Sequence, residues 1–359
     1  MAPSKYVVER ELSSGGMGRV FLGRLNGQAD FFRPIVIKRL LDADDLDMVA
    51  LFVEEARRYA VLDHENIGRI FDFERVDGQL SIILEYIDGW SLVDFLERHR
   101  QTGEVPNAEL CVFIASRVCR ALQYVYEGSG IVHRDVSPSN IMMTREGAVK
   151  LIDFGIAARS GKRESRLSGK PAYMAPEMVV ELRADNRSDL FGLGAVLYEM
   201  LTLDRLFKGA TTSDVLGQVV AGQVPSPREI RPEIPEGVVE ILRKALQRDP
   251  EQRYQSAAEM GQACEHFLYD KGYGPTNLTL KKHLLALWPE AASGRKPSES
   301  ESFPVIEPTL IPIGDGSDRV THLGADDATR AALPLDVRPA SLPPGPGTLA
   351  PRHIKKRQR

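Results

Sequence analysis

The spacing of apolar residues changes near residue 87, and this change restricts the folds that the chain can adopt. Before it, short apolar runs separated by turn residues predict strands, with one helix expected over residues 47–62. After it, apolar residues recur at helical spacing in longer segments, which cover 91–99, 107–126, 188–201, 213–221, 235–247 and 257–269. The sequence therefore predicts an α+β fold with two lobes, a small β-rich N-lobe and a larger α-helical C-lobe.

The last part of the chain, residues 291–359, differs in composition. It holds 10 of the 23 prolines and a single aromatic residue, Phe303. Such a segment buries too little apolar surface to offset the entropy lost on ordering, which predicts a disordered tail. Its basic end, residues 352–359, is expected to be solvated, with contact to an anionic partner as the alternative.

The charge balance and the cysteines exclude several classes of protein. With 46 basic and 50 acidic side chains, the formal net charge is −4, which argues against a nucleic-acid partner. No run reaches the roughly 18 apolar residues of a membrane span, and charged residues stand where a signal peptide is apolar. We therefore expect a cytoplasmic protein. Cys111, Cys119 and Cys264 form no CxxC pair, which indicates reduced thiols.

A glycine-rich turn lies between two predicted strands, residues 6–11 and 19–24. Its glycines, Gly15, Gly16 and Gly18, leave backbone N–H groups open to phosphate oxygens, because no Cβ shields them. An ordinary hairpin turn is the alternative for this pattern in isolation.

A lysine closes the apolar run 35–37 shortly after that turn. Lys38 at the end of a buried strand requires a partner for its charge, and Glu55 on the following helix could supply it. For Lys38 considered alone, a side chain that extends to solvent is the alternative.

Two further clusters combine carboxylates with an amide. Residues 133–140 contain Asp135 and Asn140, and residues 150–155 contain Asp153. These side chains carry the oxygen ligands that Mg²⁺ prefers, and one carboxylate would remain free to act as a base. Each aspartate alone would be read as a surface residue in a turn, but their order along the chain favours a shared site.

In this order, the motifs resemble those of protein kinases, specifically the bacterial Hanks-type Ser/Thr kinases. The resemblance covers residues 6–268. It rests on the glycine-rich turn with Val20, on Lys38 and Glu55, and on the segments 133–140, 153–155, 173–177, 187–189 and 249–254. It implies a kinase domain over 6–268, with an N-lobe over about 6–85, a hinge at 85–89 and a C-lobe over about 90–268.

The resemblance also implies a role for each matching residue. Lys38 would hold the α- and β-phosphates of ATP and pair with Glu55, while Asp135 would accept the proton of the substrate hydroxyl. Asn140 and Asp153 would carry Mg²⁺. The ATP contacts would come from Leu12, Gly15, Gly16, Gly18, Val20, Lys38, Glu85 and Ile87. Glu177 and Arg253 would form a buried ion pair, and Asp189 would hold the catalytic loop.

Three positions depart from the family pattern. Ser13 replaces the first glycine of the phosphate loop, a change that affects turn geometry more than phosphate contact. Ser137 stands where Ser/Thr kinases usually carry lysine, and Lys170 stands where they usually carry threonine. We interpret this as a reciprocal exchange, in which Lys170 supplies the charge for the γ-phosphate and Ser137 the hydroxyl. An impaired site is the alternative.

The segment between Gly155 and Tyr173 is basic and contains serines. Ser165 and Ser168 are candidate phosphorylation sites, because phosphate added among these cations would order the loop. A solvated basic loop is the alternative.

Together these features predict an enzyme that transfers the γ-phosphoryl group of Mg-ATP to Ser or Thr of protein substrates. Pro138, three residues after Asp135, matches the pattern of Ser/Thr kinases rather than that of tyrosine kinases. Self-association for autophosphorylation is expected to be possible. A pseudokinase scaffold and a small-molecule phosphotransferase are the alternatives. Beyond the kinase match, residues 272–290 predict an amphipathic helix that packs on the helical lobe, or else docks a partner.

Overall fold

The computed structural model describes residues 5–15, 18–29, 31–40, 46–154, 158–159, 167–270, 272–292 and 310–311. Of the predicted tail, 291–292 and 310–311 fall within these ranges, and the rest lies outside the described residues. Gly16, Gly155 and Ser165 also lie outside them.

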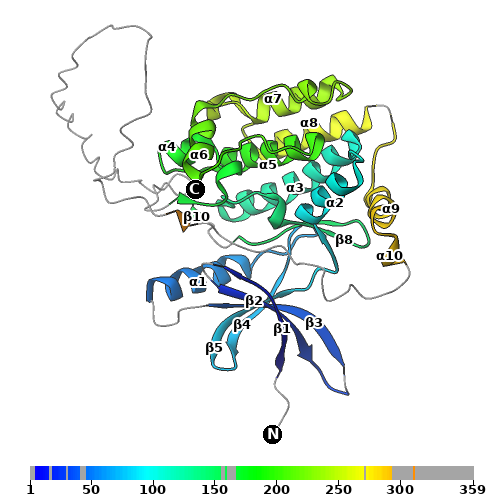
Figure 1. Cartoon of the computed structure of the whole chain (residues 1–359). Helices are drawn as coiled ribbons and strands as arrows, with labels where there is room; N and C mark the ends of the chain where they lie inside the picture. The colour runs from blue at the N-terminus through cyan, green and yellow to red at the C-terminus, as the bar shows by residue number, and fades with distance from the viewer. Residues whose placement is uncertain are drawn as a thin grey trace, which may run out of the picture. The chain divides into compact units, whose positions relative to one another are not determined.

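The N-lobe is an antiparallel sheet of five strands with one helix beside it (Figure 1). The strands follow the order β1-β2-β3-β5-β4. Their bounds are β1 Tyr6–Gly15, β2 Gly18–Asn26, β3 Phe32–Leu40, β4 Ile70–Val76 and β5 Gln79–Glu85, and the helix α1 spans Leu46–Tyr59. Each connection between neighbouring strands in sequence is therefore a hairpin, except that α1 separates β3 from β4.

Alternation along β3 explains why the sheet has two apolar faces. Ile35 and Ile37 are fully buried on one face, in a cluster with Tyr6 of β1. Leu40 and Ile82 belong to a second cluster, which includes Phe52 and Ala56 of α1. Successive strand residues point to opposite faces, so one strand contributes to both clusters.

The C-lobe is mainly helical and carries a small sheet next to the hinge. Its helices are α2 Leu92–Thr102, α3 Ala108–Ser129, α4 Pro176–Val180, α5 Asn186–Thr202, α6 Thr212–Ala221, α7 Glu236–Ala245, α8 Ala257–Tyr269, α9 Asn277–Leu287 and α10 Pro289–Ala292. The small sheet has the order β6-β8-β9, from Gly89–Ser91, Ile141–Thr144 and Val149–Leu151. The two-lobed α+β architecture predicted from the sequence is confirmed.

The centre of the C-lobe is formed by α3 and α5. Residues 188–202 of α5 are all buried, and α3 buries most of its length, so both helices are core elements rather than amphipathic surface helices. Local signals fix their starts. The Asn107 side chain accepts from the Glu109 N–H, and Asp185 and Ser188 form a reciprocal capping box.

Short strands and 3-10 turns complete the part of the chain around the cleft. The 3-10 turn Pro138–Asn140 belongs to the predicted catalytic loop, residues 133–140, and the 3-10 turn Pro171–Tyr173 lies further along the chain. Strand β10 Ala158–Arg159 pairs with β7 Ile131–Val132, and β11 Leu167–Ser168 pairs with β12 Leu310–Ile311. Within the described ranges, no helix combines the length and apolar character that a membrane crossing requires.

Candidate active site

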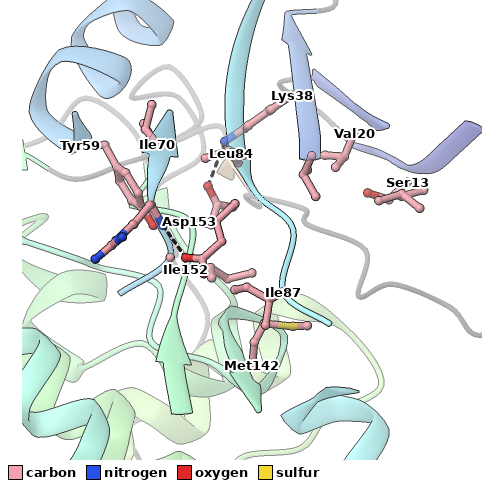
Figure 2. Close-up of a pocket in the computed structure, with 15 residues that line it drawn as sticks. Ser13, Val20, Lys38, Tyr59, Ile70, Leu84, Ile87, Met142, Ile152 and Asp153 are labelled. Carbon is pink, nitrogen blue, oxygen red and sulfur yellow. Dashed lines mark hydrogen bonds and ion pairs between the residues drawn. The ribbon is translucent and has the colours of Figure 1, made fainter. Parts of the chain in front are cut away.

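A largely apolar pocket lies where the N-lobe sheet meets the small sheet of the C-lobe (Figure 2). Its lining comes from segments far apart in sequence. The lining residues are Leu12, Ser13, Val20, Val36, Lys38, Tyr59, Gly68, Arg69, Ile70, Leu84, Glu85, Ile87, Met142, Ile152 and Asp153. An apolar cleft with a few charged groups at one end is the usual form of a small-molecule site.

Lys38 and Asp153 form an ion pair across this pocket. The Lys38 Nζ lies 2.9 Å from the Asp153 Oδ1, and both side chains are more than nine-tenths buried (Figure 2). Burial alone would raise the pKa of the Asp153 carboxyl, but the charge and hydrogen bond of Lys38 outweigh it and hold that pKa below its ordinary value. The pair therefore stays ionised. Glu55 lies in α1, but its side chain is outside the described set, so the predicted Lys38–Glu55 pair stays a prediction.

The catalytic loop holds Asp135 in a fixed position. The Asn140 Nδ2 donates to both the main-chain oxygen and the Oδ2 of Asp135, each at 2.8 Å. The Asp135 N–H in turn donates to the His133 Nδ1 at 3.2 Å. All three side chains are buried, so these contacts are shielded from competing water.

Asp189 of α5 holds the backbone of the same loop. Its two carboxylate oxygens accept the N–H groups of His133 and Arg134 at 2.8 and 2.7 Å. Burial raises the pKa of Asp189 to about 6, against the opposing effect of His133 and of the two N–H donors. The sequence-based expectation that Asp189 ties the catalytic loop to the lobe agrees with this geometry.

Two residues at the site have left-handed backbone conformations. The φ angle is 69° at Arg134 and 59° at Asp153. Such angles are strained for residues other than glycine and persist only where surrounding contacts enforce them. The local sequence does not predict these left-handed conformations.

Asn140 is hydrogen-bonded to the residue before Asp153, which bears on the predicted metal. The Ile152 N–H donates to the Asn140 main-chain oxygen at 2.9 Å, so the residue after Ile152 is brought next to Asn140. Their amide and carboxylate oxygens are hard donors of the kind that a divalent cation prefers. Within the described residues, His, Cys, Asp and Glu do not gather in groups of three or more suited to a metal. The Asn140–Asp153 pair fits a cation whose remaining ligands come from phosphate and water.

Lys170 makes two contacts with the Asp135 carboxylate. Its N–H donates to Oδ1 and its Nζ to Oδ2, both at 3.0 Å. Gly169 permits this approach, because a Cβ at that position would lie 2.6 Å from the Arg134 main-chain oxygen. The Ser137 hydroxyl is fully buried and lies 3.5 Å from the main-chain oxygen of Asp135 rather than beside its carboxylate. Both residues of the predicted exchange therefore contact Asp135, through different groups.

The glycine-rich turn has a structural as well as a candidate binding role. Gly15 pairs with Gly18 at the closed end of the β1–β2 hairpin. A Cβ on Gly18 would lie 2.4 Å from the Arg39 main-chain oxygen, so the close approach of β2 to β3 requires glycine here. Leu12 and Val20 on either side line the pocket.

The hinge is fixed through the Glu85 side chain. Its Oε2 accepts from the Lys150 Nζ and from the Arg69 N–H, each at 3.1 Å. These contacts come from β9 and from the segment before β4, so the hinge is tied to both lobes. Ile87 follows and lines the pocket.

Several pocket residues were not expected from the sequence. The unexpected lining residues are Val36, Tyr59, Gly68, Arg69, Ile70, Met142 and Ile152. None of them belongs to a motif, and for the apolar ones the local sequence pattern does not distinguish a pocket residue from a core residue. Of the candidate phosphorylation sites, Ser165 lies outside the described residues, and Ser168 is placed in β11 by its backbone alone.

A buried ion pair lies next to the start of α5, because Glu177 also accepts from the Ser188 hydroxyl. The Arg253 Nη1 and Nη2 donate to the Glu177 carboxylate at 2.7 and 2.8 Å, and the Arg253 side chain is fully buried. Arg253 also donates to the main-chain oxygens of Gln247, Arg248 and Arg187. The pairing that the family resemblance implied is present, with its donors saturated.

Comparison with known proteins identifies the family. A model of the protein kinase domain matches residues 6–268. The chain is 36% identical over 299 residues to the tyrosine-protein kinase MasK of Myxococcus xanthus, covering 77% of this chain and 46% of that protein. It is 34% identical over 268 residues to the serine/threonine-protein kinase PknB of Mycobacterium leprae, covering 71% and 42%. It is 30% identical over 262 residues to the serine/threonine-protein kinase PrkC of Bacillus subtilis, covering 71% and 39%.

The chain therefore belongs to the protein kinase family, among the bacterial kinases of the Hanks type, as its motifs indicated. It spans less than half the length of these curated relatives.

Proposed function

We propose that the protein is an ATP-dependent protein serine/threonine kinase. The observation that carries this proposal is an apolar pocket lined by the buried Lys38–Asp153 pair, with the pocket residue Ile152 hydrogen-bonded to Asn140, which in turn fixes Asp135. Phosphoryl transfer requires a pocket for the nucleotide base, charged side chains for the polyphosphate and its cation, and a carboxylate for the acceptor hydroxyl.

ATP would place its base in the apolar pocket. Val20 and Leu84 of the N-lobe and Met142 of the C-lobe supply apolar contacts around it, while the backbone of the hinge from Glu85 to Ile87 offers hydrogen bonds. The phosphates would extend toward the glycine-rich turn and Lys38, whose buried ammonium would hold the α- and β-phosphates. Contacts from Leu12, Gly15, Gly16 and Gly18 belong to the same proposal.

Asn140 and Asp153 would hold the divalent cation, for which we propose Mg²⁺. When bound, the cation neutralises charge on the phosphate oxygens. The Lys38 ammonium keeps Asp153 ionised and thereby ready as a ligand.

Asp135 would act on the acceptor hydroxyl. The hydroxyl oxygen forms a bond to the γ-phosphorus as the bond to the bridging oxygen of ADP breaks, and the hydroxyl proton passes to the Asp135 carboxylate. Lys170 would leave Asp135 and bring its ammonium to the γ-phosphate, where the family usually uses the residue at position 137. Asn140 keeps the Asp135 carboxylate oriented throughout this exchange of partners.

Specificity for serine and threonine is supported by Pro138 in the catalytic loop and by the names of PknB and PrkC. Tyrosine is the second candidate acceptor, because MasK is named a tyrosine kinase. Protein substrates, including a second copy of this chain, and phosphorylation at Ser165 or Ser168 are part of the proposal. A pseudokinase scaffold would bind nucleotide without transferring phosphate.

Radiolabelled ATP with magnesium tests the proposal. The full chain is incubated with and without a generic protein substrate, beside the Asp135→Asn variant, and the labelled products are hydrolysed to phosphoamino acids. We expect transfer to serine or threonine, and a loss of two or more orders of magnitude in the variant, which keeps the shape of Asp135 without its basic carboxylate. Equal rates for the two proteins would refute the assignment of this site, and phosphotyrosine as the main product would refute the specificity.

A further inference from the structure

The helices α9 and α10 lie beyond the matched kinase domain yet pack into the C-lobe core. Leu280, Leu284 and Leu287 of α9 are buried in the main apolar cluster. A Cβ on Gly147, in the turn between β8 and β9, would lie 2.0 Å from the Asn277 main-chain oxygen. The beginning of α9 is therefore in close contact with the turn that follows β8.

The end of α9 brings Trp288 against the first strand after the hinge. The rings of Trp288 and Trp90 are stacked, with centroids 4.6 Å apart and planes 15° from parallel. Both side chains are buried. Arg98 of α2 fixes this end of the helix, because its Nε donates to the Leu287 main-chain oxygen at 2.9 Å. Stacked aromatic rings of this kind hold their partners more firmly than burial alone does.

Arg145 connects the same region to the hinge. Its Nε donates to the Asp88 carboxylate at 2.8 Å and its N–H to the Asp88 main-chain oxygen at 3.0 Å. Its Nη1 donates to the Ala291 main-chain oxygen at 3.4 Å, and its guanidinium lies 5.2 Å from the Trp90 ring centroid. One side chain thus contacts the last hinge residues, Trp90 and α10.

Strands β6 and β8 connect α9 and α10 to the pocket. Trp90 of β6 pairs with Met143 of β8, and the neighbouring Met142 lines the pocket. Ile87, three residues before Trp90, also lines the pocket. The backbones of β6 and β8 are in close contact at Gly89, since a Cβ there would lie 1.9 Å from the Met143 main-chain oxygen. A shift of β6 would therefore be transmitted to the hinge and to the pocket.

We propose that Trp288 is a positioning residue for nucleotide binding, and that α9 and α10 set nucleotide affinity by fixing β6 and the hinge through Trp90 and Arg145. The inference rests on the proposed function, because it takes the pocket to be the nucleotide site. A base that bonds to the hinge backbone depends on sub-ångström placement of that backbone, so a support outside the pocket can control affinity. Phosphoryl transfer itself depends on Asp135 and Asn140, which α9 does not hold.

A matched control separates positioning from simple stabilisation. Leu280 is fully buried on the same helix, eight residues and about 12 Å before Trp288 along the axis. Leu280→Ala removes apolar packing as Trp288→Ala does, but away from β6. Trp288→Phe restores an aromatic ring at the stacking position. Arg145→Gln is a milder change at the partly exposed side of the contact and keeps the proposal testable if Trp288→Ala does not fold.

The experiment measures the dissociation constant of a fluorescent ATP analogue with magnesium, together with KM for ATP, kcat and the unfolding midpoint without nucleotide. We expect Trp288→Ala to raise Kd and KM about tenfold with kcat changed less than about twofold, and Arg145→Gln to raise them about threefold. Trp288→Phe should recover most of the affinity, while Leu280→Ala should lower the unfolding midpoint and leave Kd close to that of the wild type.

Unchanged Kd in both Trp288→Ala and Arg145→Gln would overturn the inference, as would an equal loss of affinity in Leu280→Ala. The wild type in the same experiment distinguishes this outcome from a failure of the proposed function. If the wild type binds no nucleotide, the proposed function falls and the inference with it. If it binds and the variants bind equally well, the inference alone is wrong.

Discussion

The two lobes each supply one lysine to a site aspartate, but they hold it differently. Lys38 of the N-lobe reaches across the cleft to Asp153, so this ion pair depends on how the sheet meets the C-lobe. Lys170 reaches Asp135 within the C-lobe, where the loop on both sides is already fixed by Asn140 and Asp189. Asp135 is thus held by contacts within the C-lobe, while the contact of Lys38 with Asp153 joins the two lobes.

The two lobes also differ in the size of their apolar clusters. The N-lobe sheet has two small apolar clusters, one on each face, while Tyr59, Leu62 and Ile67 of the N-lobe belong to the large cluster. The C-lobe has one large cluster and also contains fully buried ionic groups such as Arg253. Buried polar groups are stable where their hydrogen bonds are made, and the Arg253 guanidinium makes them with Glu177 and with three main-chain oxygens. We therefore expect removal of Lys38 to slow phosphoryl transfer, and loss of the buried Arg253–Glu177 pair, which lies outside the pocket, to lower stability.

The largest effect is expected from Lys38→Met. It removes the cation that balances the triphosphate and leaves Asp153 without its partner, so phosphoryl transfer should fall by about two orders of magnitude or more. Lys5→Met is the matched control, since Lys5 pairs with Asp72 on the exposed surface of the same lobe and lies outside the pocket. Initial rates with labelled ATP, with circular dichroism to check folding, measure both. Equal rates for Lys38→Met and Lys5→Met would show that Lys38 does not contribute to phosphoryl transfer.

The next effect is on stability, from Arg253→Met in the C-lobe. The change leaves Glu177 buried without its bidentate donor, which should cost about 3–5 kcal/mol in the free energy of unfolding. Lys244→Met breaks an exposed pair with Glu259 and should cost no more than about 1 kcal/mol. Urea unfolding of the two variants measures the difference. A loss of similar size in both would show that the buried pair does not stabilise the C-lobe.

A smaller effect concerns pH and the contact between α2 and α9. The His99 Nδ1 lies 2.6 Å from the Glu104 main-chain oxygen and must donate to it, so the His99 Nε2 accepts from the His283 Nε2 at 3.0 Å. Burial, then the charge of His99, lowers the pKa of His283 to about 4, and burial lowers the pKa of His99 as well. Both rings are therefore neutral in the folded state at neutral pH.

The unfolded chain protonates these histidines near pH 6.5, so it binds more protons than the folded chain between about pH 6.5 and 4. Stability from this pair should be complete above pH 6.5 and decline as the pH falls. Between pH 7 and 5, His283→Gln should lose about 1 kcal/mol less stability than the wild type, after allowance for partial solvent screening. His266→Gln, on the exposed face of α8, is the control. Parallel stability curves for the wild type and His283→Gln would contradict this interpretation.

Much of the fold follows from local sequence, but the pocket follows only in part. The change from strand to helix periodicity predicted both lobes, because each element buries one face or stripe. The helix expected over 47–62 ends at Tyr59, three residues early, and the small sheet β6-β8-β9 was not anticipated. Strands of three or four residues are too short to show a period.

The candidate site was likewise predicted only in part. Lys38, Asp135, Asn140 and Asp153 were predicted because their chemistry is unusual in their segments. Tyr59 and Met142, which line the pocket, are ordinary apolar residues, and only the meeting of distant segments distinguishes them from the core. The support from Trp288 to the hinge depends on contacts between residues about 200 positions apart, for which a single sequence carries no local signal.

We propose that Lys170 serves as the cation of the C-lobe site, in exchange for the serine at 137. If so, Lys170→Thr removes the γ-phosphate cation and Ser137→Lys brings two ammonium groups to one carboxylate, so each change alone should slow phosphoryl transfer. The double variant restores the arrangement usual in the family. Rates for the four proteins on one substrate, with unfolding midpoints checked, should give a coupling energy of about 0.5–3 kcal/mol and partial recovery in the double variant. Strictly additive losses would contradict the claim and leave Lys170 as a cation that merely contacts Asp135.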